Sequence, residues 1–205
     1  MDCYGCCALV ACSICFFIFL YRFIYLVRLG NPKDLSQKRG NTSRAIKYSF
    51  TGAMLPQNKE SAYLHLPTYI AGVLFHIGTF LTLFIFVCQV VFSFVDITIP
   101  QIVRQIVAVI LIPAIISGFS VLFKRVFSKK LKIISGPDDY ISNLLTTSAQ
   151  LFTAICLFFP DTAPAYYIVM TLFFLWLPFG KTRHLLYFFF ARYHLGYFYG
   201  WRGTW

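Results

Sequence analysis

Four histidines are the residues of this chain whose type and position are best suited to chemistry: His65, His76, His184 and His194. His76 lies inside an apolar segment, LHLPTYIAGVLFHIGTF, which covers residues 64–80. An ionisable side chain at membrane depth is costly and is usually functional. Imidazole nitrogen is also a common ligand of haem iron. The histidines therefore predict a haem site between membrane helices.

His76 and His184 form the predicted ligand pair. The helix with His76 is expected to run outward and the helix with His184 to run back, so that both imidazoles lie toward the same half of the membrane. This is the usual arrangement for bis-histidine haem ligation in a helix bundle. Gly72 precedes His76 by four residues, and Gly180 precedes His184 by four. On each helix the neighbour on the ligand's own face lacks a side chain, which leaves clearance for a flat macrocycle.

Lys181 and Arg183 stand beside the second predicted ligand, where they are candidates to pair with haem propionates. A different interpretation needs no cofactor, because histidines within a membrane can hydrogen-bond between helices or lie in the headgroup region. We favour ligation of one haem b by His76 and His184, since ionisable residues at depth are usually functional.

His65 and His194 form a second pair at matching heights. By helical rise, His65 lies about 16 Å from His76, and His194 lies about 15 Å beyond His184. Both border charged or interfacial sequence, which favours interfacial or hydrogen-bonding roles. A second haem or a quinone contact is the alternative for both. Tyr69, one helical turn after His65, is a further candidate quinone contact.

The elements that position these residues are predicted from composition. The chain has 205 residues, of which 59% are hydrophobic and 12% charged, too few polar groups for a water-soluble surface. A membrane crossing needs about 20 apolar residues. The apolar runs predict an all-α, polytopic membrane protein with five transmembrane helices, at approximately 8–27, 69–91, 102–123, 141–159 and 165–184. An inner connector covers 29–66, and the whole chain, 1–205, is predicted to form a single domain.

Charge predicts the orientation of these helices. Of the 18 Lys and Arg residues, 17 fall on one side of the predicted topology and only Arg104 lies near the other, where the connectors carry Asp96 and Asp161. The positive-inside rule places the N-terminus outside and the C-terminus in the cytoplasm of a multi-pass protein of the cell's inner membrane. The net charge of +11 is thereby explained without nucleic-acid binding. An acidic partner or anionic lipid on the inner face is a secondary possibility.

Two segments carry local structure signals. Pro137, Asp138 and Asp139 in SGPDDY predict a helix start, because acidic side chains favour the positive end of the helix dipole. We favour this interpretation over catalysis or metal binding by the paired acids. Within the inner connector, SRAIKYSFTGAMLP mixes basic and apolar residues and predicts a short interfacial helix.

The N-terminal cysteines form two C-x-x-C patterns, Cys3 with Cys6 and Cys12 with Cys15. Such spacing can bind zinc or an iron–sulfur cluster. Cys12 and Cys15, however, fall inside an apolar helix without a polar loop. Free cysteine is an ordinary buried apolar residue, so packing is favoured over a metal centre, and over lipidation or a disulfide.

The chain from about Lys59 onward resembles the membrane cytochrome b family of the respiratory nitrate reductase gamma subunit. The resemblance is carried by LFHIG around His76, by LPFGKTRH ending in His184, by five spans with an outside N-terminus, and by a basic tail ending in WRG. The stretch KESAYLHLP is closer to the relatives that partner heterodisulfide-reductase-like iron–sulfur proteins. The resemblance implies that His76 and His184 match the pair that holds the haem nearest the cytoplasm.

One departure from the family concerns a second, outer haem. Two-haem members carry further histidines at the positions that are Phe86 and Tyr166 here. Phenylalanine has no lone pair to offer iron, so the outer haem of that pattern is expected to be absent.

The resulting functional prediction is a haem b membrane anchor that relays electrons between the quinone pool and a cytoplasmic iron–sulfur subunit of a respiratory complex. The haem would supply the electron chemistry and the protein its ligation and orientation. We expect an electron-transfer subunit that assembles with other membrane or redox subunits, and not a complete enzyme alone. A haem-free structural or assembly subunit is the principal alternative. A transporter is weaker, because the spans contain few charges to form a substrate path.

Overall fold

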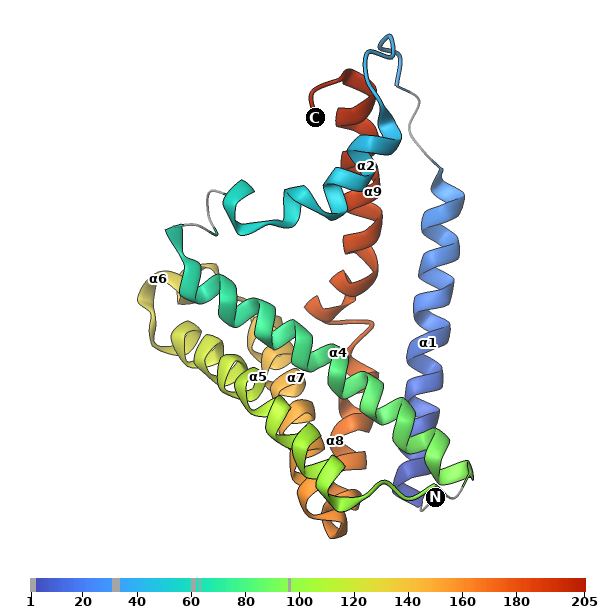
Figure 1. Cartoon of the computed structure of the whole chain (residues 1–205), viewed down its shortest axis with the longest axis vertical. Helices are drawn as coiled ribbons and strands as arrows, with labels where there is room; N and C mark the ends of the chain where they lie inside the picture. Colours follow the sequence, from blue (N-terminus) through green and yellow to red (C-terminus); the bar gives the residue numbers. More distant parts are fainter. Residues whose placement is uncertain (1–2, 31–33, 60–61, 63, 96) are drawn as a thin grey trace. The chain divides into compact units, whose positions relative to one another are not determined.

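In a computed structural model, the described residues are 3–30, 34–59, 62, 64–95 and 97–205, and that part of the chain contains helices and connectors but no strand. Figure 1 shows the helices, which are α1 (Cys3–Leu29), α2 (Thr42–Phe50), α4 (Leu66–Val95), α5 (Gln101–Phe127), α6 (Lys129–Ile134), α7 (Pro137–Phe158), α8 (Ala163–Trp176) and α9 (His184–Arg202). Single 3₁₀ turns cover Gly52–Met54, Pro56–Asn58, Pro160–Thr162 and Lys181–Arg183. The predicted all-α class is confirmed for these residues. Asp96 and Lys33, two charged residues of the predicted connectors, lie outside them.

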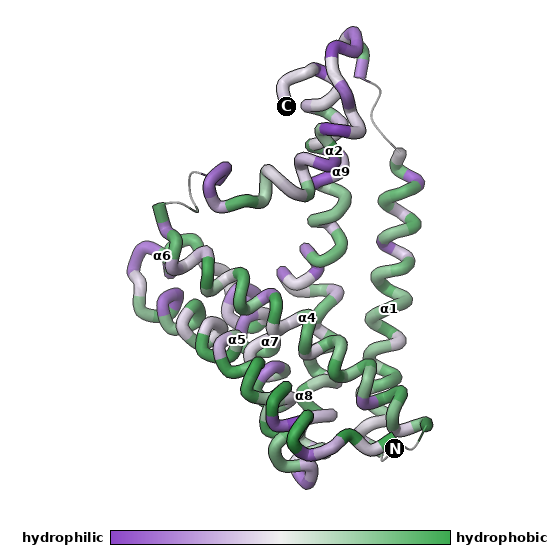
Figure 2. The backbone as a smooth tube through the Cα atoms, viewed as in Figure 1, coloured by the Kyte–Doolittle hydropathy of each residue, from purple (hydrophilic) through white to green (hydrophobic). Residues whose placement is uncertain are grey.

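Several of these helices are apolar and long enough to cross a bilayer, which indicates a multi-pass membrane protein. Four pass by themselves, namely α1, α4, α5 and α7, and a fifth span exists only if α8 and the helical segment after it count as one broken span. Figure 2 shows hydrophobic residues along α1, α4 and α5, and hydrophilic residues at α6. The predicted fifth helix at 165–184 is therefore wrong as a continuous element, because α8 ends at Trp176.

The break after α8 has a local cause in LPFGKTR. Pro178 has no N–H to donate to the preceding turn, and its ring disfavours helical geometry. The chain turns instead, with the N–H groups of Phe179 and Gly180 both donating to the Trp176 carbonyl at 2.9 and 3.0 Å. The Thr182 hydroxyl donates to the Leu177 carbonyl at 2.9 Å. Proline and glycine between two apolar runs were the available signal for this interruption.

The contacts within the chain form two compact units, and the single domain predicted for residues 1–205 stays a prediction. Residues 1–16 and 70–182 form the first, called the bundle unit here, and residues 17–69 and 183–205 form the second, the tail unit. Helices α1 and α4 contribute to both.

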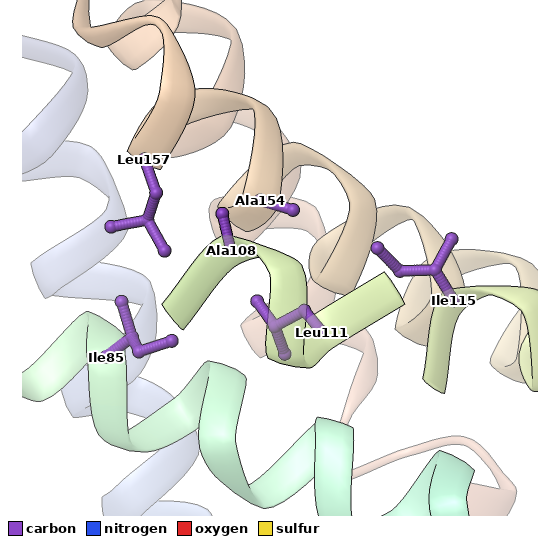
Figure 3. Close-up of a cluster of buried hydrophobic side chains, with 6 residues drawn as sticks. All are labelled: Ile85, Ala108, Leu111, Ile115, Ala154 and Leu157. Atoms are coloured by element: carbon purple, nitrogen blue, oxygen red, sulfur yellow. The ribbon is translucent and has the colours of Figure 1, made fainter. Parts of the chain in front are cut away.

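The core of the bundle unit lies where α4, α5 and α7 meet. Figure 3 shows this cluster, which consists of Ile85, Ala108, Leu111, Ile115, Ala154 and Leu157. Two glycines let the helices approach closely. A Cβ at Gly78 would overlap Ala114, and a Cβ at Gly118 would overlap the Thr147 hydroxyl. Small residues at helix interfaces are the usual means of packing membrane helices, because lipid leaves little hydrophobic drive for association.

The start of α7 confirms the predicted capping role of Asp139. Its carboxylate accepts the Gly136 N–H at 3.0 Å, and Pro137 occupies the first helical turn. Proline is favoured there because its missing N–H would have no helical partner.

In the tail unit, α2 packs against α9, and the two helices lie side by side in Figure 1. The contact depends on Gly196 and Gly200. A Cβ at Gly200 would lie 2.5 Å from the Ala45 Cβ, and one at Gly196 would lie 2.5 Å from the Ile46 Cα. The helix predicted within SRAIKYSFTGAMLP thus exists as α2, and its described partner is α9.

Candidate functional site

His76 lies in the middle of α4, with its side chain exposed on the bundle unit. Its Nδ1 is 2.6 Å from the carbonyl oxygen of Gly72. Because a carbonyl can only accept, this bond requires the hydrogen on Nδ1, and in the neutral imidazole Nε2 is then the nitrogen with the lone pair. A ring nitrogen fixed by a backbone carbonyl is the common arrangement behind a metal-binding histidine. The geometry of His76 therefore fits an iron ligand through Nε2.

Gly72 leaves open space beside His76. A Cβ built on Gly72 would meet no atom within 4 Å outside its own helix turn. The clearance that the sequence predicts is thus present on α4 in the described part of the chain.

Gln150 forms hydrogen bonds to α4 close to His76. It is fully buried on α7, and its Nε2 donates to the Phe75 carbonyl at 3.0 Å and to the Thr79 hydroxyl at 2.9 Å. These two residues flank His76, one immediately before it and one three residues after it. The side-chain amide thereby fixes the rotation of α4 at the candidate ligand. Sequence analysis missed this residue.

A signal for Gln150 exists in the spacing of polar residues along α7. Thr146, Gln150 and Thr153 recur every three to four residues within an apolar span, and all three are buried. A polar stripe at helical spacing inside a membrane helix indicates contact with neighbouring helices.

Gly180 and Lys181 have protein partners within the bundle unit. A Cβ at Gly180 would overlap the Trp176 indole nitrogen and lie 2.7 Å from the Ser142 hydroxyl, so packing by itself explains the glycine. The Lys181 ammonium lies 2.5 Å from Asp139, whose side chain is only 5% exposed, and Arg125 lies 2.8 Å from the same carboxylate oxygen. Haem packing by Gly180 and propionate pairing by Lys181 stay predictions.

Asp138 anchors the turn that leads to His184. Its carboxylate accepts the Lys181 N–H at 3.1 Å and the Ser142 hydroxyl at 2.6 Å. Lys181 begins the 3₁₀ turn that precedes α9. The paired acids of SGPDDY therefore serve both the start of α7 and the start of this turn.

His184 is the first residue of α9, and both it and Arg183 are exposed. His184 belongs to the tail unit, whereas His76 belongs to the bundle unit. Haem ligation by this pair, and the contact of Arg183 with a propionate, stay predictions.

Tyr69 lies in the first turn of α4 and His65 immediately precedes this helix, both in the part assigned to the tail unit. His65 is exposed. The Tyr69 hydroxyl donates to the Met54 carbonyl at 2.9 Å, and the Lys59 ammonium lies 5.5 Å from the centre of the Tyr69 ring. Burial, with the positive charge of Arg192, lowers the pKa of Lys59. Tyr69 thus has a local structural role, and a quinone contact by either residue stays a prediction.

His194 is half-buried on α9 and lines a cavity of about 720 Å³ in the tail unit. The other lining groups are largely apolar, such as Leu26 and Phe190, with Tyr197 also present. One wall carries an ion pair, in which Arg202 lies 2.7 Å from Asp34. A cavity that is mostly apolar with a few polar groups is typical of small-molecule sites.

The polar wall of this cavity is well ordered by hydrogen bonds. The hydroxyl of Ser36 donates to the Asp34 carboxylate at 2.7 Å, and its N–H donates at 3.0 Å. These bonds, with the charge of Arg202, hold the pKa of Asp34 below its ordinary value. The carboxylate is therefore charged at neutral pH and keeps the Arg202 guanidinium in place.

The two positions where two-haem cytochromes carry further histidines are filled with packed side chains. Phe86 is 1% exposed and Tyr166 is fully buried. The Phe86 ring lies 4.8 Å from that of Phe174, centre to centre. Both residues belong to the bundle unit, where they are part of the protein core.

The cysteines Cys3 to Cys15 lie on α1, with Cys3 and Cys6 exposed and Cys15 buried. Among the described residues, no three His, Cys, Asp or Glu side chains come together in a way that could hold a metal ion. A bis-histidine haem site needs only two such residues, so this finding does not bear on it.

Comparison of the chain with models of known families, with curated proteins and with solved structures finds no match. The resemblance to the membrane cytochrome b family stays a prediction from the motifs themselves.

Proposed function

We propose that this protein is a haem b membrane subunit that relays electrons between membrane quinone and an iron–sulfur partner in the cytoplasm. The observation that carries the proposal is the geometry of His76. Its Nδ1 is hydrogen-bonded to the Gly72 carbonyl, and the space beside Gly72 is open. Nε2 is thus the nitrogen suited to iron, with room for a flat group on the same helix face.

His184 is the proposed second ligand, and Arg183 the proposed partner of a haem propionate. Bound haem would supply one-electron chemistry, its potential set by the axial ligands and their surroundings. The chain's own residues hold the ligands: the Gly72 carbonyl orients the His76 ring, and Gln150 orients α4. The packed side chains at Phe86 and Tyr166 support one haem and not two.

The cavity around His194 is the proposed quinone site. Its apolar and aromatic walls suit a quinone ring and tail, and an imidazole can hydrogen-bond a quinone oxygen. Of the three predicted quinone contacts, His194 is the one that lines a cavity of suitable size.

The distribution of basic residues supports a membrane orientation for the chain and a docking face for its partner. We propose five crossings with the N-terminus outside and the C-terminus in the cytoplasm of the cell's inner membrane, because 17 of 18 basic residues then face inward. The basic inner face would dock the iron–sulfur partner, since complementary charge favours association.

A haem-free structural or assembly subunit is the second candidate. It is favoured by the protein contacts of Gly180 and Lys181, which explain both residues without a cofactor.

The test is a reduced-minus-oxidised absorbance spectrum of the purified full chain and of His76→Ala and His184→Ala, with His65→Ala as control. We expect a haem b band in the parent and the control, and its loss or displacement in the other two variants. Absence of the band from the parent would favour the structural subunit. An unchanged band in both ligand variants would contradict this pair of ligands.

A further inference from the structure

A second cavity, which the proposed electron-transfer function does not use, lies in the bundle unit. It has a volume of about 560 Å³ and is lined by the end of α4, the first turn of α5, the end of α7 and the start of α8. No histidine lines it among the described residues. Its rim reaches the surface at Ile97, which is 51% exposed.

Arg104 supplies the only charge among the described lining residues. It is the one basic residue at its end of the predicted bundle, and its Nε is buried without a hydrogen-bond partner. In the described part of the chain, no carboxylate lies within ion-pair distance of Arg104. A buried guanidinium nitrogen without an acceptor is costly, so the cavity has unused capacity for an anionic oxygen.

Gln89 supplies the complementary group. Its Oε1 is also buried without a partner and belongs to the lining of the same cavity. An amide oxygen can only accept. The cavity therefore presents one unsatisfied donor and one unsatisfied acceptor, surrounded by apolar side chains such as Ile99 and Leu157.

We propose that this cavity binds a membrane phospholipid whose headgroup combines a phosphate with a hydroxyl or ammonium donor. The phosphate would accept from Arg104, whose planar fork matches phosphate oxygens. The hydroxyl or ammonium group would donate to Gln89, and an acyl chain would lie along the apolar wall. The position of Arg104 in the first turn of α5, at the end of a candidate span, suits headgroup depth.

The experiment is a lipid titration of the delipidated full chain in detergent, followed by native mass spectrometry. Phosphatidylglycerol has the phosphate and hydroxyl donors, whereas phosphatidylcholine has the same phosphate without a donor. We expect the parent to bind phosphatidylglycerol more tightly. Arg104→Gln is expected to weaken both lipids roughly tenfold, which corresponds to about 1.4 kcal/mol. Gln89→Leu is expected to weaken the binding of phosphatidylglycerol and to leave that of phosphatidylcholine unchanged, because only phosphatidylglycerol has a hydroxyl that could donate to Gln89.

Lys130→Gln is the matched control, because it removes the same charge from an exposed residue of α6. It is expected to leave both affinities unchanged. Equal binding to Arg104→Gln and the parent would overturn the proposal. Displacement of phosphatidylglycerol by millimolar inorganic phosphate would assign the site to a free anion instead. If Arg104→Gln does not fold, Arg104→Lys keeps the charge but loses the fork, and weaker binding of both lipids is still expected.

Discussion

Both units of this protein pack helices closely at glycines, and they differ in how many buried polar groups join the helices. In the bundle unit, several buried polar groups connect the helices. Asp139 contacts Arg125 and Lys181, and the side-chain amide of Gln150 donates a hydrogen bond to the backbone of α4. In the tail unit, α2 and α9 pack at glycines and share one buried hydrogen bond, which the Ser49 hydroxyl donates to the Arg192 carbonyl at 2.6 Å. Buried polar contacts fix one orientation of a helix, whereas close glycine packing mainly requires that no side chain intervenes.

The two candidate haem ligands accordingly differ in the polar contacts that position them. His76 lies on a helix whose rotation is set by hydrogen bonds at Phe75 and Thr79. His184 lies at the first residue of a helix, immediately after a turn anchored by Asp138. We therefore expect substitutions in the bundle unit to affect stability and the His76 environment together, and substitutions in the tail unit to affect stability first.

Asp139→Asn is expected to have the largest effect. It leaves Arg125 and Lys181 without their shared carboxylate, and because both cations are partly exposed the expected cost is that of lost hydrogen bonds to a charged group, about 1.5–3 kcal/mol. The measurement is the thermal unfolding of the purified protein in detergent. Asp161→Asn removes an exposed carboxylate and serves as the control. Equal melting temperatures for the two variants would show that the network of Asp139 does not stabilise the bundle unit.

Gly200→Ala is expected to come next. Its Cβ would lie 2.5 Å from the Ala45 Cβ and 2.9 Å from the Thr42 backbone, and such overpacking costs about 1–3 kcal/mol. Gly72→Ala is the matched control, because its Cβ meets open space. The control is expected to unfold at the parent's temperature or slightly above, while its haem content falls. A control as unstable as Gly200→Ala would remove the contrast between these glycines.

Gln150→Leu is expected to have a smaller effect on stability. Hydrogen bonds between membrane helices contribute about 0.6–1.7 kcal/mol. If Gln150 positions His76, the reduction potential and the electron paramagnetic resonance spectrum of the haem should also change. Thr171→Val removes a hydroxyl that donates to a carbonyl of its own helix, and it should change neither property. A normal spectrum in Gln150→Leu would leave the amide with a purely structural role.

Asp34→Asn is expected to have the smallest effect, one that depends on pH. The pKa of Asp34 is lower in the folded protein than the ordinary 3.8. A lowered carboxyl pKa contributes stability that is present above pH 3.8 and is lost as the pH falls toward the folded pKa. The parent and Asp34→Asn should therefore differ in melting temperature at pH 7, and the difference should shrink as the pH falls below 3.8. The opposite trend would mean that the carboxylate is destabilising.

Apolar runs predicted the helices well and their interruptions poorly. Four predicted spans correspond to α1, α4, α5 and α7, each extended by a few residues. The predicted fifth span is broken at Pro178, because hydropathy averages over a window and does not register one missing N–H. The capping role of Asp139 was predicted, since a cap depends on neighbouring residues only.

In the candidate site, too, features that depend on neighbouring residues were predicted and contacts between distant segments were not. The type and spacing of His76 and Gly72 were visible in the sequence, because four residues along a helix always share a face. Gln150 was not singled out, because its partners, Phe75 and Thr79, are more than seventy residues away in the chain. The GxxxG pair of Gly196 and Gly200 was overlooked among aromatic residues, although its spacing is a known signal for helix contact.

The sequence by itself determined helices that are long and apolar enough to cross a membrane, because apolar length acts locally and needs no partner. Tertiary structure alone decided which polar side chains meet. The packing pairs Lys181 with Asp139 and lets Gln150 hydrogen-bond to α4. It leaves Arg104 Nε and Gln89 Oε1 without hydrogen-bond partners in the wall of a cavity. The reason is geometric: a buried hydrogen bond requires two groups to meet within about 3 Å, and only the packing of distant helices sets that distance.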